Sequence, residues 1–337
     1  MEIEFVSVPD VPLPWAMLSG PNWLRHPVLQ RADALVLDSI AAAPAAPWLG
    51  RLPMPMLGML HQPLGGMDTG RVVRWVRAPF DRWAYRRAQL LMVASEWLAA
   101  QLADAGIPRS RLLVVPPGKD PETGHAGQLG NNVQATTAEL RHGRRAAALC
   151  VANWLPRKGI LELLEAVALL PDELVSLHLV GEVTTPGPYA GRVRRRLAQS
   201  DLAGRVMVHR GVSAAAVARM YRSVDIFVLP SFEEPYGTVW GEAMAAGLPV
   251  VGWHAGNLPF LAKHEHEALL APAGDVLALS RALQRLALEP ELRSAMGRAA
   301  RKRADSFPTW DETADRFFTA VAQVLSAAAG PRAVEGH

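Results

Sequence analysis

The sequence contains almost no cysteine and no long apolar run. Cys150 is the only cysteine among 337 residues, so the chain can form no internal disulfide, and its place in the apolar run at 146–152 is typical of a buried core residue. No stretch of about 18 apolar residues lacks a charge or a proline, so no membrane-spanning helix is predicted. Glu2 follows Met1 without a basic and then apolar leader, which favours a cytoplasmic protein over an exported one.

A strong excess of one charge is also missing. The 35 basic residues against 32 acidic residues give a formal net charge of +3. An excess this small is not the electrostatic footprint of a nucleic-acid-binding protein, so no nucleic-acid partner is expected. Hydrophobic residues make up 50% of the chain and charged residues 20%, which is the balance of a globular enzyme long enough for two domains.

The C-terminal half alternates short apolar runs with helical patterns. Strands are predicted at 147–152, 174–180, 206–209, 226–229 and 249–252. Helices are predicted at 160–170, 192–200, 214–223, 239–246, 276–288, 291–305 and 313–328. This α/β alternation predicts a doubly wound parallel sheet with helices on both faces, whose ligands bind at the carboxyl ends of the strands.

The N-terminal half shows the same alternation more faintly. Strands are predicted at 3–8, 34–38, 55–61, 90–94 and 112–115, and helices at 72–87 and 96–105. The resulting division is a Rossmann-like domain at 1–117, a linker at 118–145 with a mobile loop around 124–132, a second Rossmann-like domain at 146–308, a helix at 309–329 and a disordered tail at 330–337.

Two carboxylates flank the start of the helix predicted at 239–246. Glu234 precedes this helix and Glu242 lies within it. The backbone amides of Tyr236, Gly237 and Thr238 are expected at the helix N-terminus, where the helix dipole favours a phosphate. The segment therefore predicts a binding site for a diphosphate.

Glu234 and Glu242, with seven residues between them and the run Ala-Met-Ala-Ala-Gly-Leu-Pro-Val-Val after them, resemble the paired-glutamate motif of the retaining glycosyltransferases of family 4. The resemblance covers about residues 30–325 and is strongest from Val151 onward. It implies the GT-B fold, in which two Rossmann-like domains face a cleft and the final helix crosses back to the first domain. The N-terminal domain is shortened relative to the family, because the segment after residue 8 lacks the usual glycine-rich loop and helix.

The resemblance implies roles for three candidate catalytic residues. Glu234 would contact hydroxyls of the transferred sugar, Lys158 would neutralise the leaving nucleoside diphosphate, and His61 would lie near the reacting sugar. The alternatives are that Lys158 belongs to a solvated pair with Arg157 and that His61 is a plain loop residue.

A second set of residues is expected to bind the donor. Glu242 would accept hydrogen bonds from the ribose, and because a carboxylate in an apolar helix lacks partners, a polar ligand is expected there. Asn153 stands where the family usually has an arginine, and Arg157 is the candidate substitute. The donor-binding candidates are Glu242, Arg157, Asn153, Tyr236, Gly237 and Thr238.

No metal and no cofactor are expected, because an ammonium group and a helix N-terminus can stabilise a departing diphosphate. The sequence also has no Asp-x-Asp motif. The predicted function is metal-independent, retaining transfer of a hexose from a nucleoside-diphosphate sugar, the co-substrate, to an acceptor hydroxyl. The alternatives are a non-catalytic subunit that binds sugar nucleotides, motivated by Asn153, and a nucleotide-sugar epimerase or a phosphorylase on the same scaffold.

The acceptor is expected to be a sugar that is lipid-linked or a small molecule. The segment 71–87 is rich in arginine and aromatic residues. Such a helix can contact an anionic membrane, which would place the protein at the inner face of the membrane, or it can pack its aromatic side chains on the sheet.

Overall fold

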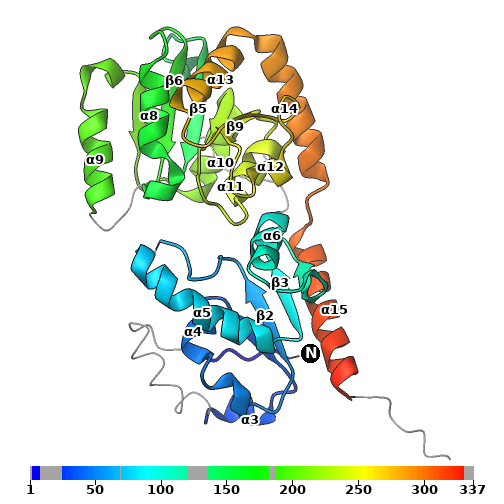
Figure 1. Ribbon diagram of the computed structural model, residues 1–337. Helices are drawn as coiled ribbons and strands as arrows, with labels where there is room; N and C mark the ends of the chain where they lie inside the picture. Colours follow the sequence, from blue (N-terminus) through cyan, green and yellow to red (C-terminus); the bar gives the residue numbers. More distant parts are fainter. Residues whose placement is uncertain (1, 8–24, 69, 120–135, 182–186, 330–337) are drawn as a thin grey trace, which may run out of the picture. The chain divides into compact units, whose positions relative to one another are not determined.

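The computed structural model describes residues 2–7, 25–68, 70–119, 136–181 and 187–329. The chain divides into two compact units (Figure 1), the first formed by Met1–Pro117 with Trp310–His337 and the second by Gly118–Thr309. The loop predicted at 124–132 and the tail predicted at 330–337 lie outside the described residues.

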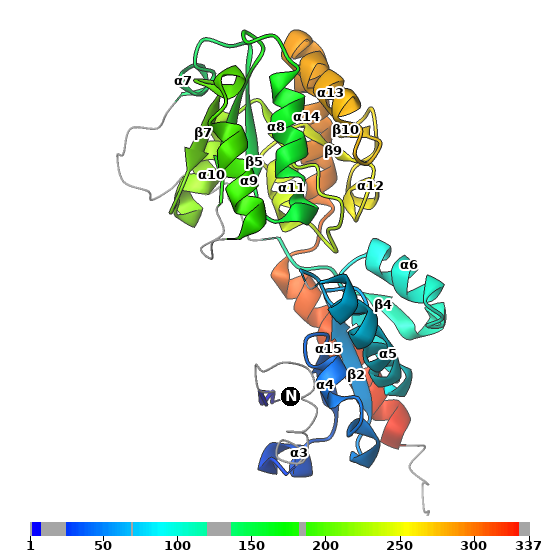
Figure 2. The same cartoon turned by 60° about the vertical axis from the view of Figure 1, so that its left-hand side comes forward.

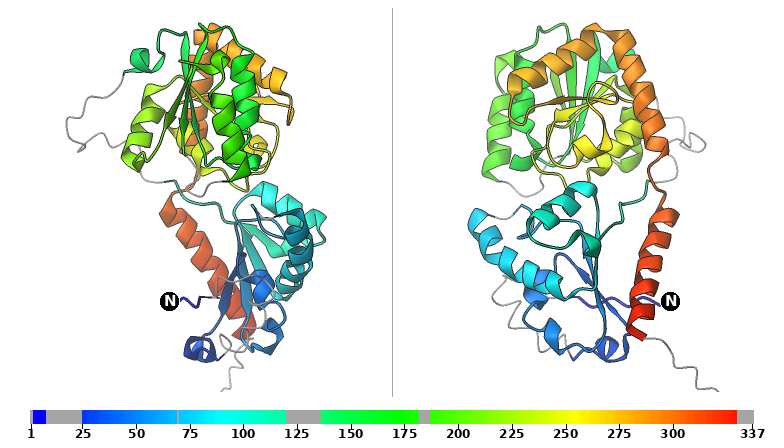
Figure 3. Two further views of the ribbon diagram at one scale, coloured as in Figure 1. Left: turned by 90° about the vertical axis from the view of Figure 1, so that its left-hand side faces the viewer. Right: turned by 45° about the vertical axis from the view of Figure 1, so that its right-hand side comes forward.

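The first unit is built on a four-stranded parallel sheet. Its strands, in spatial order, are β1 (Leu35–Asp38), β2 (Met56–Leu60), β3 (Leu90–Val93) and β4 (Leu112–Val114). Its helices are α3 (Pro27–Arg31), α4 (Ala42–Ala45), α5 (Arg71–Arg87), α6 (Glu96–Asp104) and α15 (Trp310–Ala329). Because side chains alternate along a strand, the sheet has two apolar faces. Helices α4, α5 and α6 cover one face and α15 covers the other, where Leu57 and Met92 pack against Ala320 (Figure 3).

The prediction of a strand at 3–8 is wrong for the residues that the structure describes, because residues 2–7 form no helix or strand. Val6 packs against the core and Glu4 pairs with Arg31 at 2.8 Å. The side chains of Ile3 and Phe5, however, remain exposed. A strand here would bury too little apolar surface to offset its ordering.

The second unit is built on a six-stranded parallel sheet. In spatial order its strands are β10 (Ala268–Ala271), β9 (Val250–Trp253), β8 (Ile226–Val228), β5 (Ala146–Val151), β6 (Val175–Val180) and β7 (Val206–His209). Helices α8 (Ile160–Ala168), α9 (Pro188–Leu197) and α13 (Val276–Leu288) pack together on one face. Helices α10 (Ala214–Ser223), α11 (Thr238–Ala245), α12 (Leu258–Leu261) and α14 (Pro290–Asp305) lie on the other (Figures 2 and 3). The predicted doubly wound sheet is confirmed.

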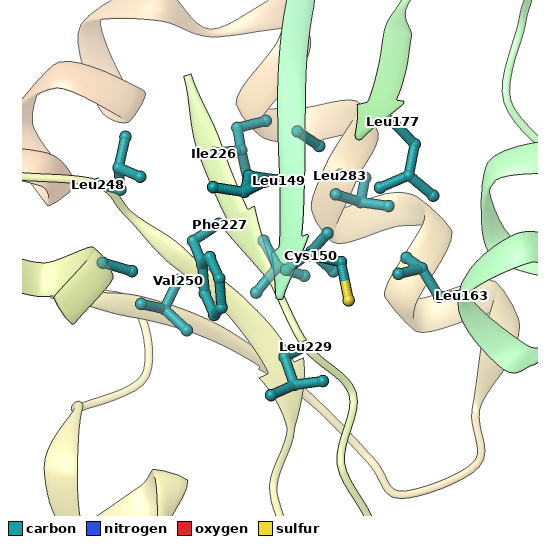
Figure 4. Close-up of a cluster of buried hydrophobic side chains, with 14 of the residues drawn as sticks. Leu149, Cys150, Leu163, Leu177, Ile226, Phe227, Leu229, Leu248, Val250 and Leu283 are labelled. Atoms are coloured by element: carbon teal, nitrogen blue, oxygen red, sulfur yellow. The ribbon is translucent and has the colours of Figure 1, made fainter. Parts of the chain in front are cut away.

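The core of this unit explains why the apolar runs form central strands. Side chains from β5, β6, β8 and β9 meet Leu163 of α8 and Leu283 of α13 (Figure 4). Strands buried on both faces require such continuous apolar sequence. Cys150 lies in this core, as predicted, and its burial raises the pKa of the thiol to about 12.

Helices α3, α4, α7 (Thr137–Leu140) and α12 and strand β10 were not predicted. Strand β10 extends the sheet beyond β9 in parallel register, with Leu269 opposite Val251. Helix α7 lies inside the segment predicted as linker, where Thr136 and Glu139 form a capping box. Arg141, just after α7, binds the Asp225 carboxylate with two hydrogen bonds of 2.8 and 2.6 Å, which attaches this part of the predicted linker to the second unit.

Candidate functional site

The candidate donor site lies at the carboxyl ends of β5 and β8, two adjacent strands in the centre of the second sheet. From β5 the chain crosses to β6 on one side, and from β8 it crosses to β9 on the other. The loops that leave these two strands therefore diverge, and such a switch point is where doubly wound sheets bind ligands.

The loop after β5 is held directly against the loop after β8. The backbone amide of Phe232 donates to the carbonyl oxygen of Arg157 at 2.7 Å, and the Ser231 hydroxyl donates to the same oxygen at 3.0 Å. Gly159 has a φ of 66°, and a Cβ atom there would collide with the carbonyl oxygen of Pro230. Only glycine fits this conformation and this close approach. The two loops therefore form one supported structure.

Lys158, Arg157 and Glu234 meet across these loops. The Lys158 ammonium pairs with Oε2 of Glu234, and Nη1 of Arg157 lies 3.3 Å from the same oxygen. The three side chains are 12%, 18% and 13% exposed, respectively. Charges that are largely removed from water interact more strongly than surface pairs. The alternative, in which Lys158 and Arg157 form a solvated pair, is therefore wrong.

The loop after β9 supports Glu234 from the other side. The backbone amide of Asn257 donates to the Glu234 carbonyl at 3.0 Å, and its side-chain amide donates to the Tyr236 carbonyl at 2.9 Å. Gly256 has a φ of 57°, and a Cβ atom there would lie 2.9 Å from the Glu234 amide nitrogen. Asn257 and Gly256 are contributors to the site that the sequence analysis missed.

Helix α11 begins next to this carboxylate. Gly237 is its N-cap residue, with a φ of 85°, and within the described part of the chain no side chain caps the helix. Thr238 is exposed, whereas Tyr236 is partly buried, which raises the pKa of its phenol. Uncapped amides at a helix N-terminus attract an anion.

Glu242 differs from its prediction. It is partly buried on α11, but the hydroxyl of Tyr221 on α10 is hydrogen-bonded to it. Burial, followed by the charge and hydrogen bond of Glu242, raises the pKa of Tyr221 well above its ordinary value. The expectation that Glu242 lacks a protein partner is therefore wrong, because the partner lies on a neighbouring helix. Its proposed contact with ribose remains a prediction.

Asn153 and Arg157 occupy different positions within the loop after β5. Asn153 is exposed, whereas the Arg157 guanidinium is directed to Glu234 and to the carbonyl oxygen of Glu233, at 3.3 Å from each. Arg157 therefore places a guanidinium beside Lys158, and its substitution for an arginine at position 153 remains a prediction.

His61 belongs to the first unit and follows β2. Its Nε2 lies 3.5 Å from Oδ2 of Asp38, which ends β1, and both side chains are 44% exposed. The Asp38 carboxylate also accepts a hydrogen bond of 2.7 Å from the amide of Ile40. Parallel neighbouring strands bring these two residues together, although they are far apart in sequence.

Comparisons with known proteins identify the family. The family model described as Glycosyl transferases group 1 matches residues 135–303, and the model described as Glycosyl transferase 4-like domain matches residues 2–118. The chain belongs to the group 1 glycosyl transferases. The resemblance that the paired glutamates carry is thereby confirmed.

Two curated relatives of this glycosyl transferase are informative. The GDP-mannose-dependent alpha-(1-6)-phosphatidylinositol monomannoside mannosyltransferase of Mycolicibacterium smegmatis is 28% identical over 75% of the chain. The D-inositol 3-phosphate glycosyltransferase of Streptomyces coelicolor is 32% identical over 62% of the chain. The chain spans 70% of the first relative's length and 47% of the second's.

Solved structures of similar fold include sucrose-phosphate synthase from Thermosynechococcus elongatus, with a TM-score of 0.75 and 23% identity over 94% of this chain and 78% of that one. Anabaena HepE in complex with UDP-glucose has a TM-score of 0.74 and 18% identity over 93% of this chain and 84% of HepE. At these identities the similarity establishes the fold, which is GT-B.

Proposed function

We propose that this glycosyl transferase transfers a sugar from a nucleoside-diphosphate sugar to an acceptor hydroxyl, with retention of anomeric configuration and without a metal. The observation that carries the proposal is the junction of Lys158, Glu234 and the uncapped start of α11 at the switch point of the second sheet. Relatives and structures named for GDP-mannose and UDP-glucose support a nucleotide-sugar donor.

In this proposal the Lys158 ammonium and the amides at the start of α11 bind the diphosphate. Negative charge grows on the diphosphate as the bond from its oxygen to the anomeric carbon breaks. A fixed cation and fixed dipoles stabilise that charge more in the transition state than in the ground state, which is the condition for catalysis. Arg157, beside Lys158, supplies the second cation.

Retention follows if the acceptor attacks from the face that the diphosphate leaves. The acceptor oxygen forms the new bond to the anomeric carbon, the electron pair of the broken bond goes to the diphosphate, and the acceptor proton passes to a diphosphate oxygen. Glu234 would orient the transferred sugar through its hydroxyls, and Glu242, held by Tyr221, would bind the ribose. No protein nucleophile is needed.

A donor panel tests this proposal. GDP and UDP release should be measured with GDP- and UDP-sugars and a mixture of sugar and lipid-linked acceptors. We expect turnover with one donor, unchanged by EDTA, and NMR of the product should show the donor's anomeric configuration. Donor binding without turnover would favour the non-catalytic subunit, an epimerised donor would favour the epimerase, and a product of opposite configuration would contradict retention.

We also propose that the acceptor is presented at an anionic membrane and that α5 contacts this surface. Val72, Val73, Trp75 and Val76 are 74%, 48%, 79% and 43% exposed and neighbour one another at helical spacings. Tyr85, by contrast, is buried in the core and Phe80 packs against it, whereas Trp83 is exposed. Only Phe80 and Tyr85 of α5 therefore pack as predicted for a helix on the sheet.

The charge of α5 supports an anionic partner. The helix carries six arginines, of which Arg71, Arg86 and Arg87 are exposed, and its one acidic residue, Asp81, is buried. Each basic residue close to an anionic surface contributes about 1 kcal/mol to binding. None of the helices in the described ranges has the length and apolar character needed to cross a bilayer.

Vesicle co-sedimentation tests the membrane proposal. Binding to phosphatidylglycerol vesicles should exceed binding to phosphatidylcholine vesicles, and the double variant Val72→Ala/Trp75→Ala should bind about tenfold more weakly because it removes exposed apolar surface. Trp310→Ala, which removes a half-exposed tryptophan elsewhere in the first unit, is the matched control. Equal binding by the wild-type protein and the double variant would contradict the proposal.

A further inference from the structure

Helix α5 also holds the two loops that carry His61 and its neighbours in the first unit. These loops follow β1 and β2 at the carboxyl edge of the sheet and include Ser39, Ile40 and residues 61–67. Side chains from the inner side of α5 bind the backbone of both loops, and none of these contacts is needed to form the helix itself.

The first contact is made by Asp81. Its Oδ2 accepts a hydrogen bond of 2.8 Å from the backbone amide of Gly65. Gly65 has a φ of 86° and Gly66 a φ of 79°, and a Cβ atom at Gly65 would lie 2.6 Å from the carbonyl oxygen of Arg74. The loop after β2 therefore lies directly on the helix backbone, in a conformation that only glycine adopts without strain.

The second contact is made by Arg77. Its Nη2 donates to the carbonyl oxygens of Ser39 and Ile40 at 3.1 and 2.6 Å. Its Nε lies 3.6 Å from Oδ2 of Asp81, one helical turn away. Arg74 adds a hydrogen bond of 3.1 Å from its Nε to the carbonyl oxygen of Gly66. The ion pair of Arg77 and Asp81 thus connects the loop after β1 to the loop after β2.

Burial of the Asp81 carboxylate destabilises the fold, which is unexpected for a residue with a purely structural role. It is 1% exposed, and this burial raises the pKa of its carboxyl to about 6, although the amides of Gly65 and Ala43 and the charge of Arg77 lower it. Tyr85 on α5 interacts electrostatically with both members of the pair, and Asp38 on β1 interacts in turn with Tyr85. A buried charge is unfavourable unless its partners compensate.

We propose that Asp81 and Arg77 are positioning residues for the sugar-binding edge of the first unit, where they fix the loop of His61 and the end of the strand that carries Asp38. The inference rests on the proposed function, in which His61 lies near the reacting sugar. Neither residue touches substrate. The pair instead limits the conformations of the backbone from which His61 and Asp38 extend, so that binding energy is not used to order these loops.

The variant Asp81→Asn tests the proposal, because asparagine keeps the size of the side chain and an acceptor for Gly65 but removes the charge that holds Arg77. We expect kcat/KM to fall about tenfold, since hydrogen bonds and pairs with charged groups are stronger than neutral ones. The thermal midpoint above pH 6 should change little, because removal of the buried Asp81 charge offsets the loss of a partner for Arg77, which keeps its hydrogen bonds to Ser39 and Ile40. Asp104→Asn, which alters an exposed aspartate of α6, should match the wild-type protein.

The pH dependence gives a second readout. The folded protein binds the Asp81 proton more tightly than the unfolded chain, with a pKa of about 6 against 3.8, so stability from this group falls as the pH rises from about 4 to 6. Activity should change in the opposite direction, because the ion pair with Arg77 forms progressively as the pH rises through about 6. In Asp81→Asn the stability slope and the corresponding part of the activity profile should both be lost.

A double-mutant cycle with His61→Ala separates the two proposals. If Asp81 acts through the His61 loop, Asp81→Asn should cause little further loss in the His61→Ala background. Full activity of His61→Ala would overturn the proposed role of His61. Loss of activity in His61→Ala with unchanged kcat/KM and an unchanged pH profile in Asp81→Asn would overturn the positioning role alone.

Discussion

Replacing Lys158 with methionine is expected to lower kcat/KM by about 10²–10³ while the protein stays folded. The magnitude is that of removing one fixed group that stabilises charge in a transition state. Methionine retains most of the apolar stem, and Arg157 remains within 3.3 Å of the Glu234 carboxylate, so the carboxylate is not left without a charged partner. Steady-state assay of nucleoside diphosphate release measures the effect.

Lys302→Met is the matched control for this variant, because Lys302 is exposed on α14. It should retain wild-type kcat/KM. If Lys158→Met and Lys302→Met were equally active, Lys158 would have no role in the departure of the diphosphate.

Glu234→Gln is expected to lower kcat/KM by about 10- to 100-fold, the cost of losing hydrogen bonds of a charged group. Glutamine preserves the shape of the side chain but cannot compensate Lys158 and Arg157, whose side chains are only 12% and 18% exposed. The loss should appear in kcat as well as in KM, because Glu234 is proposed to orient the sugar and its carboxylate pairs with Lys158.

Glu234→Ala removes both contributions, because it deletes the carboxylate that pairs with Lys158 and Arg157. It should also lower thermal stability, because removing one member of a buried ion pair costs about 3–5 kcal/mol, whereas Glu291→Gln, at an exposed position of α14, should change neither quantity. Full activity of Glu234→Gln together with full stability of Glu234→Ala would contradict both assigned roles.

The central strands could be predicted from sequence because their burial is visible in the sequence itself. Strand β6 is buried along its whole length. Its nearly continuous apolar run is typical of a central strand in a parallel sheet. The segment at 3–8 has a similar apolar pattern. A strand, however, also needs a free edge of a sheet with which to form backbone hydrogen bonds, and the availability of such an edge depends on the whole fold. β10 was missed for the opposite reason, because its sequence of Ala and Leu favours no strand until β9 pairs with it.

The site shows the same division between local and distant determinants. Glu234, Lys158 and the start of α11 could be predicted because they form short continuous motifs. Their supporting residues could not, because Asn257 and Tyr221 reach the site from other elements. Asp81 likewise binds Gly65 across 16 residues of sequence, and only the fold brings them together.

The most direct test of the account is a comparison of nucleotide binding by the wild-type protein and Lys158→Met. Calorimetric titrations with GDP and GMP, and with UDP and UMP, isolate the contribution of the second phosphate. The wild-type protein is expected to bind the diphosphate of its preferred base more tightly than the monophosphate, and this preference should fall about tenfold in Lys158→Met. The same preference in both proteins would contradict the claim that Lys158 binds the diphosphate.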